Sequence, residues 1–168
     1  MINEIGHFAL VLAFVLSVLT GTMPLLALWR GWHSLAQLAI PATLVMAAAI
    51  ILSFAALVSA FLASDFSVAL VASHSHSAKP WIYKFSGTWG NHEGSLLLWI
   101  VILALFAALL AMGGRGMATG LKIRTLAVQA LTSAGFLAFC LFTSNPFARL
   151  DPPPVDGRGL NPCLLYTS

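Results

Sequence analysis

The stretch LAIPATLVMAAAIILSFAALVSAFLA, residues 38–63, decides the fold of this chain. It contains no charged side chain, and the nearest ones along the chain are Arg30 and Asp65. A helix rises about 1.5 Å per residue, so this stretch is long enough to cross the roughly 30 Å hydrocarbon core of a bilayer. We therefore predict a membrane-spanning helix over residues 38–63.

Three other apolar segments meet the same criterion: residues 5–28, 95–112 and 126–142. The first is too long for the apolar part of a cleaved signal peptide, and it has no basic start. Alanine and glycine are frequent in these segments, and small residues let membrane helices approach each other closely. The sequence thus predicts an all-α fold, a polytopic membrane helix bundle with about four transmembrane helices.

The composition excludes several classes of protein. The chain has 168 residues, of which 60% are hydrophobic and 8% are charged. A soluble domain has about 25% charged residues, so this chain cannot cover a water-facing surface of its size. The net charge of +3 is too small for nucleic-acid binding. Soluble enzymes, disordered proteins and nucleic-acid-binding modules are therefore excluded, and membrane lipid is the expected surrounding.

The basic residues predict the orientation in the membrane. The short connections, residues 29–37 and 113–125, hold four basic side chains and no acid. The long connection, residues 64–94, and the C-terminal segment hold four more, spread over more positions and mixed with acids. Lys and Arg concentrate in short cytoplasmic loops. We therefore expect the N-terminus and residues 64–94 on the outer side, which is the periplasm for a bacterial inner membrane.

The long connection carries most of the polar chemistry, and its densest cluster is WGNHEGSLLLW, residues 89–99. Glu93 and Ser95 precede an apolar run, where a carboxylate and a hydroxyl can satisfy the free amides of a helix start. A helix start with tryptophans at the membrane interface explains much of this cluster. A surface for a ligand or a partner stays open as the alternative.

The sequence predicts no metal site. His74 and His76 lie two positions apart, and His92 adds a third imidazole, but this spacing matches no zinc or copper signature. Cys140 and Cys163 form no Cys-x-x-Cys motif. The histidines are therefore expected to be solvated polar residues of the long connection.

His7 lies one turn inside the first predicted span. An ionisable residue within a membrane segment is a candidate functional residue, although near a helix end its ring can reach interfacial water. Apart from His7 and Cys140, the four predicted spans contain no ionisable side chain. This scarcity argues against a small transporter, one of the alternative functions.

Six short blocks of the chain, in this order, resemble the CcmF-type haem lyase subunit of bacterial cytochrome c maturation, a family with NrfE and CycK relatives. The blocks are Glu4-Ile5-Gly6-His7, Asp65-Phe66-Ser67-Val68, Tyr83-Lys84, residues 89–99 without Asn91, Thr143-Ser144-Asn145-Pro146-Phe147, and Asp156-Gly157 with Leu160-Asn161-Pro162. Together they cover the chain from Glu4 to Pro162, which makes the resemblance specific.

The resemblance implies a much longer, polytopic inner-membrane protein, of which residues 1–162 are an N-terminal fragment. Such a protein receives haem from a periplasmic haem chaperone and joins its vinyl groups to the thiols of apocytochrome c, together with partner subunits. The fragment is not expected to be active alone. The other alternative is a structural membrane subunit that docks a partner protein through the aromatic loop.

The family's haem-handling residues, a tryptophan-rich periplasmic segment and several histidines, are absent from this chain. The first such histidine is expected just after Pro162, where residues 163–168 depart from the family pattern and are expected to be a non-family or truncated tail. We therefore assign no catalytic residue and no haem ligand here. The candidates for a scaffold or contact surface are Trp89, Gly90, His92, Glu93, Gly94, Trp99, Asp65 and Tyr83.

Overall fold

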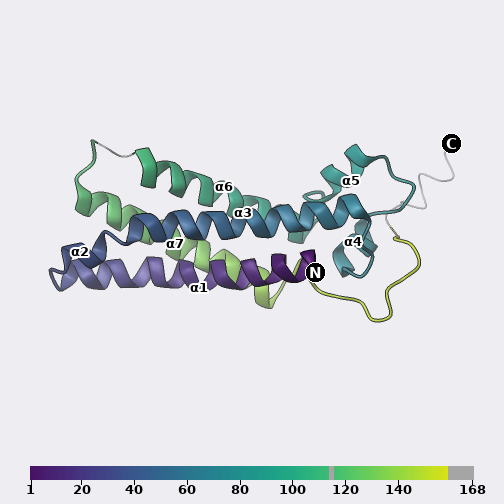
Figure 1. The fold of residues 1–168 in the computed structure, drawn as a ribbon, viewed down its shortest axis with the longest axis horizontal. Helices are drawn as coiled ribbons and strands as arrows, with labels where there is room; N and C mark the ends of the chain where they lie inside the picture. The colour runs from purple at the N-terminus through teal and green to yellow at the C-terminus, as the bar shows by residue number, and fades with distance from the viewer. Residues whose placement is uncertain (114–115, 159–168) are drawn as a thin grey trace.

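Four long helices dominate the computed structural model, which describes residues 1–113 and 116–158 (Figure 1). They are α1 (Ile2–Trp29), α3 (Ala39–Ala63), α6 (His92–Gly113) and α7 (Thr119–Phe142). Each span predicted from the sequence lies within one of them, apart from Leu38 at the start of α3. All four are long and apolar enough to cross a membrane. The predicted all-α class with four spans is therefore confirmed, and the chain is a multi-pass membrane protein.

The fourth helix begins earlier than its apolar segment does, at Thr119 instead of residue 126. Its first turns contain Lys122 and Arg124, whose charges exclude them from a predicted span. Lys122 nevertheless fits because its long stem carries the ammonium group to the end of α6, where Nζ donates to the Ala111 carbonyl at 2.7 Å.

The helices form a bundle in which α1 and α6 each pack against both α3 and α7. Its centre is filled by fully buried aliphatic side chains from all four helices, including Leu10, Leu57, Ile100 and Leu137. Small residues bring the helices close together. A Cβ added to Gly21 on α1 would lie 2.5 Å from the Leu131 side chain on α7, so these two helices depend on glycine at this crossing.

Large apolar side chains cover the outside of the bundle. Phe8, Phe106 and Phe142 are exposed, and many leucines and valines accompany them. A soluble monomer rarely carries so large an apolar surface. In a membrane protein this surface contacts lipid or further protein segments.

The two ends of the bundle differ (Figure 1). The basic end holds the short helix α2 (His33–Ala36) with Arg30, Lys122 and Arg124. The loop end holds the start of α1, the ends of α3 and α7, the start of α6 and residues 143–158. It also contains two short helices, α4 (Ala69–His74) and α5 (Trp81–Gly87), so residues 64–94 are largely folded.

Candidate functional site

Asp65 is the centre of the polar contacts between α1 and the end of α3. Asn3 Nδ2 donates to its Oδ2 at 2.7 Å, and Ser67 donates to its Oδ1 from both the hydroxyl, at 2.6 Å, and the backbone N–H, at 3.1 Å. The Ser67 hydroxyl has the largest influence on the pKa of Asp65 and lowers it, whereas partial burial raises it. The Ser67 N–H, Asn3 and Arg149 lower this pKa further. The net pKa is lowered, so Asp65 is an ionised acceptor at neutral pH.

The segment after α7 folds back against the same contacts. The Ala69 N–H donates to the Ala148 carbonyl at 2.8 Å, and the Leu150 N–H donates to the Ser67 carbonyl at 2.9 Å. Between them, Arg149 Nη2 lies 3.4 Å from Glu4 Oε1 on α1. Residues 143–158 are therefore a packed part of the loop end, although their four prolines are typical of an extended connector.

His7 lies beside this returning segment, with its ring edge-to-face against Phe147 at 6.3 Å between centroids. Its Nδ1 is buried and has no hydrogen-bond partner among the described residues. A pocket of about 570 Å³ opens next to it, and its polar lining residues include Glu4, Asn145 and Arg149. An imidazole nitrogen in this position can hydrogen-bond a water molecule or a polar group from another segment.

A second set of hydrogen bonds holds residues 156–158 against the segment after α4. The Asp156 carboxylate accepts the Ser77 N–H at 3.0 Å and the Ser77 hydroxyl at 2.6 Å, and the Arg158 N–H donates to the Ala72 carbonyl at 2.7 Å. The Ser77 hydroxyl is the main reason why the pKa of Asp156 is lowered, to about 2. The His76 imidazole lies 3.4 Å from the same carboxylate.

The histidines after α4 have separate neighbours. His74 Nδ1 contacts the Leu70 carbonyl at 3.2 Å, while His76 accepts the Ala78 N–H and faces Asp156. His74 is the last residue of α4, and His76 lies in the segment that follows it. Within residues 1–113 and 116–158, no three His, Cys, Asp or Glu side chains come together as potential metal ligands.

Replacing Asp156 with alanine is expected to release the returning segment, because the variant loses both hydrogen bonds from Ser77. Trypsin should then cleave after Arg158 several-fold faster in the detergent-solubilised protein. Asp151→Ala is the matched control, because Asp151 is an exposed carboxylate of the same segment. The pKa of Asp156 is depressed from 3.8 to about 2. The stabilisation from the Ser77–Asp156 hydrogen bonds is therefore fully present above pH 3.8 and is lost as the pH falls toward 2. Equal cleavage of the two variants at neutral pH would contradict this role.

The start of α6 is capped by Asn91, which the sequence analysis did not single out. Asn91 Oδ1 accepts the Gly94 N–H at 2.6 Å, and its Nδ2 donates to the Gly87 carbonyl at 2.8 Å. Ser95 instead donates to the His92 carbonyl at 3.0 Å. The expectation that Glu93 and Ser95 satisfy the helix start is therefore wrong for Ser95. The missed signal is that asparagine ranks among the best N-cap residues.

Gly94 permits a close approach that no other residue allows at this position. A Cβ at Gly94 would lie 1.6 Å from the Thr88 carbonyl oxygen. The turn after α5 therefore packs directly on the first turn of α6. Gly90 differs, because its added Cβ would meet backbone atoms only at 3.5 Å and beyond.

The remaining candidate residues lie at the edge of the loop end. Trp89 packs edge-to-face against Phe85 of α5, with ring centroids 4.9 Å apart, and exposed His92 lies edge-to-face against Phe139 of α7. Tyr83 and Trp99 are both more than 60% exposed, Tyr83 on α5 and Trp99 on the outward surface of α6. The structure thus joins the cluster around Trp89 and His92 to α5 and α7 through aromatic contacts.

Asp65 belongs to the other cluster, with Asn3 and Ser67. The residue before it, Ser64, contacts α5, because Lys84 Nζ donates to Ser64 Oγ at 2.7 Å. The loop end is therefore one connected surface of carboxylates, imidazoles and aromatic rings, held by contacts between distant parts of the chain. The predicted tail, residues 163–168, lies outside the described residues, as does Arg115.

Several known proteins are similar in sequence to this chain. No family model matches the chain. The cytochrome c-type biogenesis protein CycK of Rhizobium meliloti is 52% identical to it over 164 residues, which are 98% of this chain and 24% of that protein. The cytochrome c-type biogenesis protein CcmF of Pseudomonas aeruginosa is 47% identical over 165 residues, 98% of this chain and 25% of that protein.

A solved structure, of the cytochrome c heme lyase CcmF, is similar to the fold. It matches with a TM-score of 0.74 at 27% identity, over 88% of this chain and 25% of that chain. The chain spans about a quarter of the length of the curated relatives it matches.

Proposed function

We propose that this chain contributes one structural part of a haem lyase, because it belongs to the family of cytochrome c-type biogenesis proteins named CcmF, CycK and NrfE. In this proposal its four helices anchor the loop end, and the loop end supports the haem-handling segments of the longer protein. The lyase transfers haem from a periplasmic chaperone to apocytochrome c, with partner subunits that present the apocytochrome.

One observation supports this role above the others: the loop end is fixed by hydrogen bonds between segments far apart in the chain. Asn3 binds Asp65, and Ser77 binds Asp156. Such contacts hold a surface in one conformation, which is what a support for a reacting cofactor requires. The exposed edge of that surface, around Trp89, Gly90, His92 and Glu93, is the proposed contact with the haem-handling segments.

We assign no axial haem ligand among the histidines of the loop end. His74 Nδ1 contacts the Leu70 carbonyl, and His76 Nδ1 accepts the Ala78 N–H. His92 packs on Phe139 at the exposed edge, and His7 Nδ1 is buried. In the proposal haem is a substrate held by other segments of the longer protein, and the loop end supports those segments.

The proposed orientation follows from the distribution of charge. The basic end carries Arg30, Lys122 and Arg124 and lies on the cytoplasmic side of the bacterial inner membrane. The loop end then faces the periplasm, where cytochromes of the c type receive their haem in this proposal. A reporter domain that is active only in the periplasm tests the orientation when fused at Ser77 or at Thr119. Activity at Ser77 alone supports it, and activity at Thr119 alone contradicts it.

Replacing Trp89 or His92 with alanine in the full-length protein is expected to lower the yield of covalent haem in c-type cytochromes. Truncating an aromatic anchor at a contact typically costs more than 1 kcal/mol, so a drop of roughly tenfold is expected for Trp89→Ala. The measurement is haem staining of periplasmic extracts from cells whose own gene copy is deleted.

Trp89→Phe is the matched control, because phenylalanine keeps the edge-to-face packing on Phe85. Immunoblots of the membrane fraction must show equal amounts of each variant, so that loss of the protein is not mistaken for loss of contact. An unchanged haem yield in both alanine variants would remove this edge from the proposal.

A further inference from the structure

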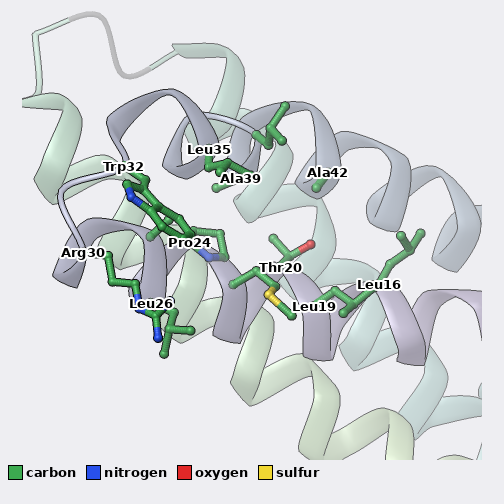
Figure 2. Close-up of a pocket in the computed structure, with 13 residues that line it drawn as sticks. Leu16, Leu19, Thr20, Pro24, Leu26, Arg30, Trp32, Leu35, Ala39 and Ala42 are labelled. Atoms are coloured by element: carbon green, nitrogen blue, oxygen red, sulfur yellow. The ribbon is translucent and has the colours of Figure 1, made fainter.

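A narrow apolar groove lies at the basic end between α1 and the α2–α3 segment (Figure 2). Its volume is about 350 Å³, within the range of small-molecule sites. Leu16, Leu19 and Met23 line it from α1. Ala39 and Ala42 line it from α3, and these small side chains leave space between the two helices.

The length of the groove matches one leaflet of a bilayer. Its α1 lining runs from Leu16 to Ala27, which is roughly 16 Å along the helix axis at about 1.5 Å per residue. Half of a roughly 30 Å hydrocarbon core is about 15 Å. A helix with its side chains is about 10–12 Å across, which is too wide for a space of this volume and length. A single hydrocarbon chain is the occupant that suits both dimensions.

Arg30 stands at the open end of the groove, one turn beyond Ala27. Figure 2 shows Arg30 and Trp32 together at one end, with Leu16 toward the other. The guanidinium carbon of Arg30 lies 5.4 Å from the centre of the Trp32 ring, an arrangement that holds the charge over the groove mouth. Tryptophan is enriched at the level of lipid headgroups, so both side chains lie where a phosphate would be.

The charge at this end selects an anionic headgroup. Residues 29–37 and 116–125 contain no Asp or Glu, so the charged groups near the groove mouth are basic. Basic pockets between membrane helices bind the headgroups of anionic lipids. We propose that this groove binds one acyl chain of an anionic phospholipid, whose phosphate pairs with the guanidinium group of Arg30.

The test measures lipid retention by the full-length protein. The protein is purified in detergent with dioleoyl phosphatidylglycerol or dioleoyl phosphatidylcholine, exchanged into lipid-free detergent, and examined by native mass spectrometry. The wild type should retain one phosphatidylglycerol and much less phosphatidylcholine. Arg30→Gln should weaken phosphatidylglycerol binding about five-fold, the factor expected for one basic residue near an anionic surface.

Two further variants separate the groove from general surface charge. Arg124→Gln is the matched control, because Arg124 is an exposed basic residue of the same end that does not line the groove. Ala42→Phe fills the groove and should abolish retention while Arg30 stays in place. Equal retention of both lipids by the wild type, equal losses in the two arginine variants, or wild-type retention by Ala42→Phe would each overturn the proposal. Melting temperatures close to that of the wild type confirm that the variants are folded.

Discussion

The Gly94→Ala protein is expected to be strongly destabilised, although the same change inside a helix is normally favourable by about 0.5–1 kcal/mol. The sign reverses because the new Cβ would lie 1.6 Å from the Thr88 carbonyl oxygen. This neighbour is backbone, so it cannot rotate away as a flexible side chain does. Either α6 moves away from the turn after α5, or Thr88 moves and the Asn91 cap is disrupted.

The expected loss is about 3 kcal/mol or more in the free energy of unfolding, the upper end of the cost of overpacking a core. A loss of this size is a large fraction of the stability of a domain, so the amount of protein in the membrane should also fall. The measurements are the melting temperature of the full-length protein in detergent and its level in membranes. The two should fall together.

Gly135→Ala is the matched control for this prediction. Gly135 also lies inside a long helix, α7, and an added Cβ would meet no atom within 4 Å. Its replacement is expected to leave stability unchanged or to raise it by up to about 1 kcal/mol. Gly90→Ala, in the same cluster as Gly94, should also be tolerated. If Gly94→Ala behaved like these two, the close approach at Thr88 would not be a constraint on the fold.

The spans could be predicted from the sequence because membrane insertion depends on one simple property, the length of an apolar segment. Residues 38–63 carry that property without interruption, and the structure places α3 there. The start of α7 could not be predicted in this way. Its first turns contain Lys122, and whether a lysine can stay in the helix depends on an acceptor in another helix, the Ala111 carbonyl.

The loop end was predictable in its composition and not in its contacts. The sequence shows that polar and aromatic residues gather in residues 64–94, but many pairings of them satisfy the same rules. The pairing of Asn3 with Asp65, and of Ser77 with Asp156, depends on how four helices bring distant segments together. Asn91 is different, because its role is local. The sequence analysis predicted that the acidic side chain of Glu93, two positions further along, satisfies the helix start, whereas the cap is Asn91.

Replacing Asp65 with alanine is expected to lower the free energy of unfolding by about 2 kcal/mol. The carboxylate accepts three hydrogen bonds, one from buried Asn3 and two from Ser67. Hydrogen bonds to charged groups contribute about 1.5–3 kcal/mol each when buried, and partial exposure of Asp65 reduces that figure. Asp65→Asn keeps the size and one acceptor oxygen, so it should lose less than Asp65→Ala.

A double-mutant cycle with Asn3→Ala isolates the contact that joins α1 to the end of α3. The coupling energy between the two positions should be about 1 kcal/mol, because they are direct partners at 2.7 Å. Asn3→Ala combined with Ser73→Ala provides the control, since Ser73 is exposed and bonds within its own helix. That pair should be additive. Additivity of Asn3→Ala with Asp65→Ala would show that the hydrogen bond does not link the helices.

The pH dependence gives an independent check on the same carboxylate. The pKa of Asp65 is lowered in the folded protein, chiefly by the Ser67 hydroxyl. A depressed pKa means that the stabilisation is fully present above the unfolded value of about 3.9 and is lost as the pH falls through the folded value. The difference in stability between wild type and Asp65→Asn should therefore be constant from pH 7 to about pH 5, and should shrink only below about pH 4. A difference that instead grows as the pH falls from 7 toward 4 would mean that burial, which raises the pKa of Asp65, dominates over hydrogen bonding.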